Sequence, residues 1–95
     1  MEIDSGRLPV EGDQFKFTVV GGIGMTQIEV RLNGRTIFQG KCPDPPCHEM
    51  IHIPLGTGGA ELVVIAQDSG GNAVERKFLV AKREGGANSA MTAGS

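Results

Sequence analysis

Five residues within eleven positions carry side chains that could do chemistry: Cys42, Cys47, His48, Met50 and His52. Thiolate and imidazole groups are the ligands that zinc prefers, and a thioether sulfur adds affinity for softer metals. Two neighbouring cysteines are also the parts of a disulfide. The segment is therefore interpreted as a disulfide loop, a metal site or a redox pair.

The cysteine spacing favours a structural disulfide between Cys42 and Cys47. The residues between them are Pro43-Asp44-Pro45-Pro46, which are stiff enough to hold the two thiols toward each other. A disulfide persists in oxidising compartments, so this pairing predicts the periplasm, the cell surface or secretion. A redox-active role is disfavoured because the spacing is not Cys-x-x-Cys and no βαβ pattern adjoins it.

Strand geometry argues against a zinc site made from Cys42, Cys47, His48 and His52. In a strand, His48 and His52 share a face but sit about 13 Å apart, while zinc needs ligand nitrogens about 2 Å away. Cys47 also points to the opposite face from His48. A site that uses His48 with Met50, or Met50 with His52, remains open for a soft metal. We predict no metal and no cofactor.

These residues must be positioned by short strands, because apolar and polar residues alternate along most of the chain. Asn33-Gly34 stands between two alternating runs and predicts a two-residue hairpin, since both central residues of a type I′ turn need positive φ. A turn cluster over 68–72 predicts a second hairpin, which closes the chain and forms the centre of the fold. The strands expected are residues 14–20, 26–32, 35–39 and 48–55 and the two arms of the closing hairpin, within 58–80.

The alternation also predicts which side chains form the core. In the closing hairpin, one inward face should contain Val64 and Phe78, with Arg76 as an exception on the same face. Ile37 competes with Phe38 for the core, which leaves Phe38 as an aromatic that could face a partner. The other expected inward residues are Phe15, Phe17, Val19, Ile28, Val30, Leu32, Ile51, Ile53, Leu55, Leu62, Ala66, Val74 and Val80.

Size and composition bound the function. The chain has 95 residues, enough for one domain, and a net charge of −2, which gives no basic patch for nucleic acid. No apolar run approaches the roughly 20 residues of a membrane span, so we predict no membrane insertion. There is no Gly-x-Ser-x-Gly motif for a nucleophile, and without Trp or Tyr a sugar-binding platform is disfavoured. We therefore expect a protein that is not an enzyme.

The domain boundaries follow from the same patterns. Residues 1–8 are polar and mixed, and we expect them to fray or to form a weak first strand. Residues 9–83 should form a single β-sandwich domain. Residues 84–95, EGGANSAMTAGS, are small and polar, and we expect a disordered tail.

The strings IEVRLNGRTIF and IPLGTGGAELVVIAQDSGGNAVERKFLV resemble a pattern found in bacterial immunoglobulin-like modules. In that pattern a strand ends in Asn-Gly, a Pro-Leu lead-in follows, and Ala-x-Asp-x-x-Gly-Asn precedes the last strand. The matching positions are Asn33-Gly34, Pro54-Leu55, Leu62, Val64, Ala66, Asp68 and Gly71-Asn72. The resemblance implies an all-β, antiparallel immunoglobulin-like sandwich of six to seven strands. The cysteine-bounded proline loop is not part of that pattern.

Such modules are accessories in cell-surface, periplasmic and secreted bacterial proteins. The resemblance therefore implies a non-catalytic spacer or protein-docking domain of a larger protein, whose partners are proteins or neighbouring domains. We expect the isolated domain to be monomeric. The alternative is a metal-binding or redox domain that uses Cys42, Cys47, His48 and His52. The expected partner contacts are Phe38, Pro43, Asp44, Pro45 and Pro46.

Overall fold

The fold is known from a computed structural model that describes residues 1–83. These residues contain no helix, and so none that could cross a membrane. The predictions of an all-β chain and of six to seven strands are confirmed. The seven strands are β1 (Glu2–Ser5), β2 (Gln14–Val20), β3 (Thr26–Leu32), β4 (Arg35–Cys42), β5 (Cys47–His52), β6 (Glu61–Asp68) and β7 (Ala73–Leu79).

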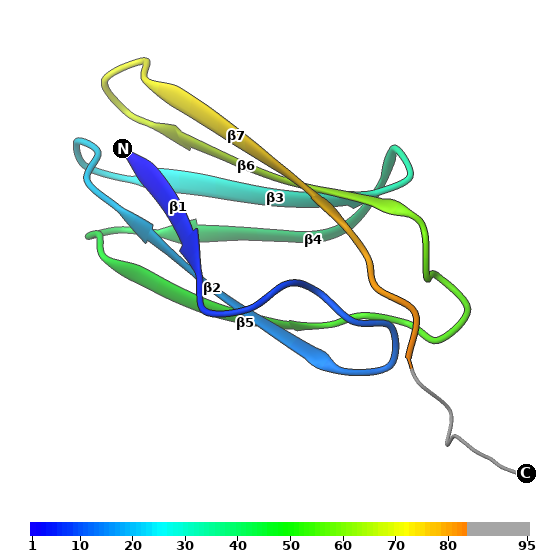
Figure 1. The fold of residues 1–95 in the computed structure, drawn as a ribbon. Coiled ribbons are helices and arrows are strands. Elements are labelled where there is room, and N and C mark those ends of the chain that lie inside the picture. Colours follow the sequence, from blue (N-terminus) through cyan, green and yellow to red (C-terminus); the bar gives the residue numbers. More distant parts are fainter. Residues whose placement is uncertain (84–95) are drawn as a thin grey trace, which may run out of the picture.

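The strands form two sheets that lie face to face (Figure 1). One sheet has the order β1-β2-β5 and the other has the order β4-β3-β6-β7, and every pair of strands is antiparallel. The closing hairpin β6–β7 forms as predicted, but it is not the centre of the fold. β7 is an edge strand, and the middle of the four-stranded sheet is β3 paired with β6. Local alternation cannot reveal this, because strand neighbours far apart in sequence are chosen by tertiary contacts.

The core fills the space between the sheets, with one row of alternate residues from each strand. Phe15 packs against Phe78 of the opposite sheet with ring centroids 5.2 Å apart and the rings edge to face, a favourable arrangement for aromatic pairs. Burying a side chain of this size stabilises the fold by about 1.5–3 kcal/mol. The buried hydrophobic residues are Ile3, Phe15, Phe17, Val19, Ile28, Val30, Leu32, Cys47, Ile51, Ile53, Ala60, Leu62, Val64, Ala66, Phe78 and Val80.

The hairpin at Asn33-Gly34 has the predicted backbone, with φ of 50° and 82°. β4 is longer than the predicted strand over 35–39, because residues 39–42 also pair with β3, and a bulge interrupts its alternation. Val30 pairs with Phe38 and Arg31 with Thr36, so Ile37 is the extra residue. Ile37 and Phe38 are both half-buried against the core, so neither excludes the other.

Leu55 departs from the predicted inward face. β5 ends at His52, and Ile53 stays buried because its backbone is held by Asp13 and Gly12. Pro54 cannot donate to a ladder, and its carbonyl accepts a hydrogen bond from the Thr57 hydroxyl as the chain turns. Leu55 is 69% exposed as a result. The prediction for this residue was wrong because the strand period stops two residues earlier than the apolar pattern suggests.

Residues 1–8 were expected either to fray or to form a weak first strand, and part of this segment forms the strand β1. β1 pairs with β2, and Ile3 is buried in the core. The tail predicted for 84–95 lies outside the described residues.

Two sets of loops lie at opposite ends of the sandwich (Figure 1). The N-terminal pole consists of Met1 and loops 21–25, 43–46 and 69–72. The C-terminal pole consists of segments 6–13, 33–34, 53–60 and 80–83. Met1 lies against Gly21, while Arg83 pairs with Asp13, and the whole of β2 separates those two contacts. The described chain therefore begins at one pole and ends at the other.

Candidate functional site

A disulfide between Cys42 and Cys47 closes the proline loop, as predicted. Cys42 is the last residue of β4 and Cys47 the first of β5, so the bond joins the edge strands of the two different sheets. Both sulfurs are used in this bond, and disulfides of this kind belong to oxidising compartments. A four-ligand cluster of Cys42, Cys47, His48 and His52 is not assembled: Cys47 is buried in the core, whereas both histidines are exposed on the outer face of β5.

The loops of the N-terminal pole rest on one row of inward-facing residues. Thr26 of β3 is opposite Cys42 of β4 on one side and opposite Asp68 of β6 on the other. Thr26 is fully buried, and its hydroxyl is 3.5 Å from the Gly24 carbonyl oxygen. The row therefore anchors the proline loop through the disulfide and the other two loops through Asp68.

Asp68 holds two loops of the N-terminal pole together. Its carboxylate accepts hydrogen bonds from the backbone N–H of Ile23 at 2.8 Å and from the Asn72 backbone and side-chain amides at 2.8 and 3.0 Å. The hydrogen bond from the Asn72 side chain is the largest cause that lowers the pKa of Asp68. The turn over 68–72 thus forms as predicted, and it also fixes a loop 45 residues away in sequence.

The N-terminal pole brings together most of the predicted partner contacts. Pro43 is in the same loop as Asp44, Pro45 and Pro46, and these last three line a hollow of about 280 Å³ with the glycine loop. Beside it, Ile23 is 63% exposed and Met25 is 42% exposed. The other predicted contact, Phe38, is elsewhere: it is half-buried along β4, with its ring over Gly40.

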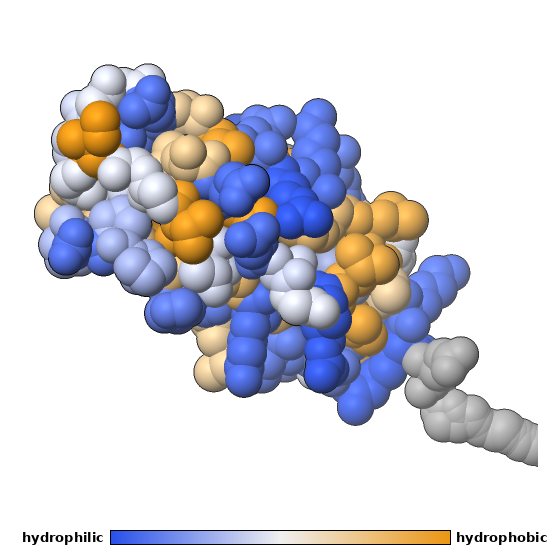
Figure 2. Space-filling model, turned by 60° about the vertical axis from the view of Figure 1, so that its left-hand side comes forward, coloured by the Kyte–Doolittle hydropathy of each residue, from blue (hydrophilic) through white to orange (hydrophobic). Residues whose placement is uncertain are grey.

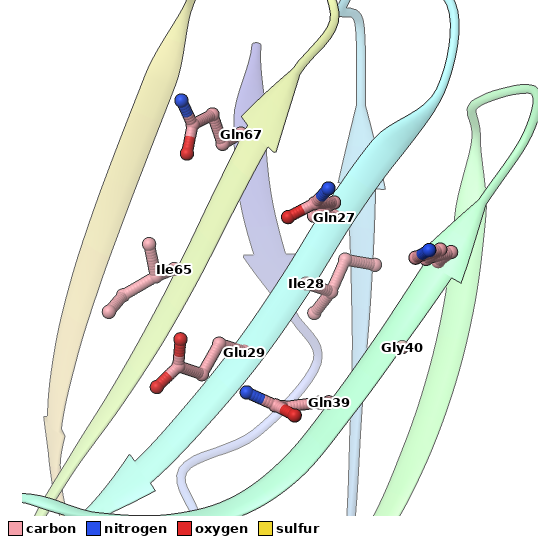
Figure 3. A pocket seen from close by; sticks show the side chains of 8 residues that line it. Gln27, Ile28, Glu29, Gln39, Gly40, Ile65 and Gln67 are labelled. Carbon is pink, nitrogen blue, oxygen red and sulfur yellow. The ribbon is translucent and has the colours of Figure 1, made fainter.

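A second hollow lies on the outer face of the four-stranded sheet, over β4, β3 and β6 (Figure 3). It has a volume of about 260 Å³. Three glutamine amides project from neighbouring strands there, and each can both donate and accept hydrogen bonds. The residues that line it are Gln27, Ile28, Glu29, Gln39, Gly40, Lys41, Ile65 and Gln67.

Two charged residues line this outer-face hollow: Glu29 is paired, whereas Lys41 forms no ion pair within residues 1–83. The carboxylate of Glu29 accepts hydrogen bonds from Arg31 Nε at 2.6 Å and from the Thr36 hydroxyl at 2.7 Å. The bond from Arg31 is the main cause that lowers the pKa of Glu29, and the same pairing raises the pKa of Arg31. The hollow therefore presents glutamine amides, the apolar side chain of Ile65 and the ammonium group of Lys41.

His48, Met50 and His52 occupy alternate positions on the outer face of β5, as predicted from the strand pattern. Met50 is 55% exposed, and the Nδ1 atom of His48 is 3.2 Å from the Thr18 hydroxyl. No group of three or more His, Cys, Asp or Glu side chains suited to a metal occurs within residues 1–83. The row supplies ligand types for a soft metal, but its residues are spaced along the strand.

Glu11 organises the C-terminal pole in the way that Asp68 organises the other. Its carboxylate accepts hydrogen bonds from the backbone N–H groups of Gly56, Gly58 and Arg83 at 2.7, 3.3 and 2.9 Å. The bond from Arg83 is the largest of the causes that lower the pKa of Glu11. Sequence reasoning did not assign this role, because the three amides come from segments distant in the chain.

The outer-face hollow was also missed. The signal available was the set of three glutamines at outward positions of three strands, but only the strand order places them together.

No protein-family model, curated protein or solved structure matches this chain.

Proposed function

We propose that this chain is a non-catalytic, immunoglobulin-like module that acts as an in-line spacer in a larger cell-surface, periplasmic or secreted bacterial protein. The observation that carries the proposal is the position of the two ends of the described chain. Met1 is at one pole and Arg83 at the other, so a chain that passes through the domain gains its whole length. Two anchored poles keep that length fixed.

The strand order supports the immunoglobulin-like assignment. In an immunoglobulin constant-type domain, strands one, two, five and four form one sheet and strands three, six and seven form the other. Here the order differs in one respect, because β4 pairs with β3 instead of β5. The disulfide supports an extracytoplasmic location, since such bonds are rare in reducing compartments.

The contacts between the sheets support a mechanical role. The disulfide joins β4 to β5 at one side of the sandwich, and on the other side Arg76 of β7 donates a hydrogen bond to the Ile3 carbonyl of β1 at 2.7 Å. Each side is thus closed by a contact between the two sheets. A spacer needs this resistance to opening, because tension applied at the two ends pulls on β1 and β7.

The outer-face hollow favours protein docking as a second role. It is rich in amide groups, which can donate and accept the hydrogen bonds that protein interfaces contain. A spacer and a docking domain make different demands on sequence. A spacer needs only length and stiffness, whereas docking needs the side chains of the hollow.

Replacement of the domain in its parent protein separates these roles. We expect a Gly/Ser linker of about 5 residues, which spans only about 12 Å on average, to abolish the parent's reach-dependent activity, such as adhesion to a distant surface. An unrelated β-sandwich with its ends at opposite poles should restore it if the role is spacing. Failure of that sandwich, together with rescue by a domain that retains Gln27, Gln39 and Gln67, would indicate docking. Full activity with the flexible linker would contradict both roles.

A further inference from the structure

We propose that the two poles form a head-to-tail contact, in which the N-terminal pole of one copy of this chain docks on the C-terminal pole of a second copy. The inference rests on the proposed in-line function and extends it, because it names what lies at each end of the module. Three observations carry it: exposed apolar side chains at both poles, a hollow at each pole, and opposite charge beside the two hollows.

Four of the six exposed large hydrophobic side chains within residues 1–83 lie at the poles, and the other two, Met50 and Leu79, lie on β5 and β7. Ile23 and Met25 belong to the N-terminal pole, with exposures of 63% and 42%. Leu8 and Leu55 belong to the C-terminal pole, with exposures of 62% and 69%. In the view of Figure 2, hydrophobic surface is visible at both ends of the molecule as well as at the centre of the face. These side chains give each pole the apolar component of a protein contact.

Each pole also has a hollow lined by glycine, where a partner can approach the backbone closely. At the N-terminal pole it lies between Gly21–Gly22 and the proline loop. At the C-terminal pole a hollow of about 540 Å³ lies between the hairpin at Asn33 and the loop Gly56–Ala60. A head-to-tail contact would bring the exposed Ile23 of one copy to the glycine loop of the next.

The charged residues that line the two hollows are opposite in sign. Asp44 lines the hollow of the N-terminal pole and is the one charged residue in loops 21–25, 43–46 and 69–72. Arg35 lines the hollow of the C-terminal pole. Both side chains are exposed, and neither forms an ion pair within residues 1–83. A head-to-tail contact would place Asp44 of one copy against Arg35 of the next.

Both poles are pre-organised for such a contact. Asp68 and the disulfide fix the loops of the first pole, and Glu11 fixes those of the second. Loops that are already ordered lose little conformational entropy on association. Because the ends of a small sandwich are narrow, we expect a weak contact between free chains, which a covalent tandem would strengthen through effective concentration.

The test is a dilution series of the full chain, followed by amide chemical shifts from about 50 µM to about 2 mM. We expect concentration-dependent shifts at residues of both poles, reduced by added salt because the contact is partly electrostatic. Absence of any shift change, or changes confined to the outer-face hollow or to β5, would overturn the proposal. The replacement experiment above does not depend on this result, so the spacer role can succeed where the contact fails.

Exchange of the charges at Asp44 and Arg35 gives the decisive experiment. D44R carries arginine beside both hollows and R35D carries aspartate beside both, so we expect each alone to lose association by about tenfold or more. An equimolar mixture of the two should regain it, because every mixed junction is complementary. Lys77→Glu, on the exposed outer face of β7, is the matched control and should leave association unchanged. A mixture no better than either variant alone would refute the head-to-tail geometry.

Discussion

Arg76 donates a hydrogen bond from Nη1 to the backbone oxygen of Ile3 at 2.7 Å and so joins the two sheets along the side opposite the disulfide. Its guanidinium also lies 5.0 Å from the centroid of the Phe78 ring, close enough for a cation–π interaction. Arg76 thus occupies an inward-facing position of an edge strand. The aliphatic part of its side chain covers the core, and its guanidinium group bridges to β1.

Arg76→Met should reveal this bridge, because methionine keeps an apolar stem but has no donor and no charge. We expect a loss of about 2 kcal/mol in the free energy of unfolding, from one charge-assisted hydrogen bond and a partly exposed cation–π contact. Urea denaturation measures it. Lys77→Met is the control, since Lys77 points outward with only a 3.9 Å contact to Glu75. Equal stability of the two variants would mean that Arg76 does not tie the sheets together.

Reduction of the Cys42–Cys47 bond should destabilise the fold without unfolding it. The loop that it closes is short, so the chain-entropy model gives about 2 kcal/mol. For a domain of this size, that corresponds to a fall in Tm of about 8–16 °C. Calorimetry with and without a phosphine reductant measures it, and the double variant C42S/C47A serves as a control that no reductant should affect. An unchanged Tm after complete reduction, verified by thiol titration, would contradict the cross-sheet role.

Asp68 should make stability depend on pH in the acid range. Its pKa is lower in the folded chain than its ordinary value of 3.8, so the unfolded chain binds more protons near that pH. Its stabilising contribution is therefore complete above about pH 4 and is lost as pH falls through the folded pKa. Asp68→Asn should be less stable than the natural chain at pH 7, and the difference should shrink below about pH 4. Thermal unfolding at a series of pH values measures this, and a difference independent of pH would exclude the carboxylate as the cause.

Two alanine substitutions can test where the row of inward-facing residues that continues from β5 ends. Ile53 is fully buried, so Ile53→Ala should cost about 2–5 kcal/mol. Leu55 is 69% exposed two residues later, so Leu55→Ala should change the stability by less than about 0.5 kcal/mol. Chemical denaturation of both variants compares them directly. Similar losses would place Leu55 inside the core, as the apolar pattern alone suggests.

The sequence predicts the strands whose two faces differ in polarity. Phe15, Phe17 and Val19 alternate with polar residues, and the register of β2 follows, because a slip of one residue would expose all three. The hairpin at Asn33-Gly34 was equally predictable, since it depends on two adjacent residues with positive φ. These features depend on local chemistry.

Features that depend on contacts between distant segments were beyond reach. The bulge at Ile37 lets Phe38 share the core, and nothing in RTIFQGKC marks it. The Cys42–Cys47 pairing could be read from spacing, but its role between the sheets required the strand order. The anchoring roles of Glu11 and Asp68 each combine residues more than forty positions apart.

The distance between the two ends of the domain tests the in-line account most directly. Spin labels attached at Glu2 and Lys82 through encoded keto amino acids would leave the native disulfide intact, and electron–electron double resonance would give their separation. Glu2 is level with Val20 of β2, and Lys82 follows the segment paired with Glu11, so the strand rise predicts about 25–30 Å between these positions. A single narrow distribution in that range is the predicted result. A separation below about 15 Å would place both ends at the same pole and contradict the account.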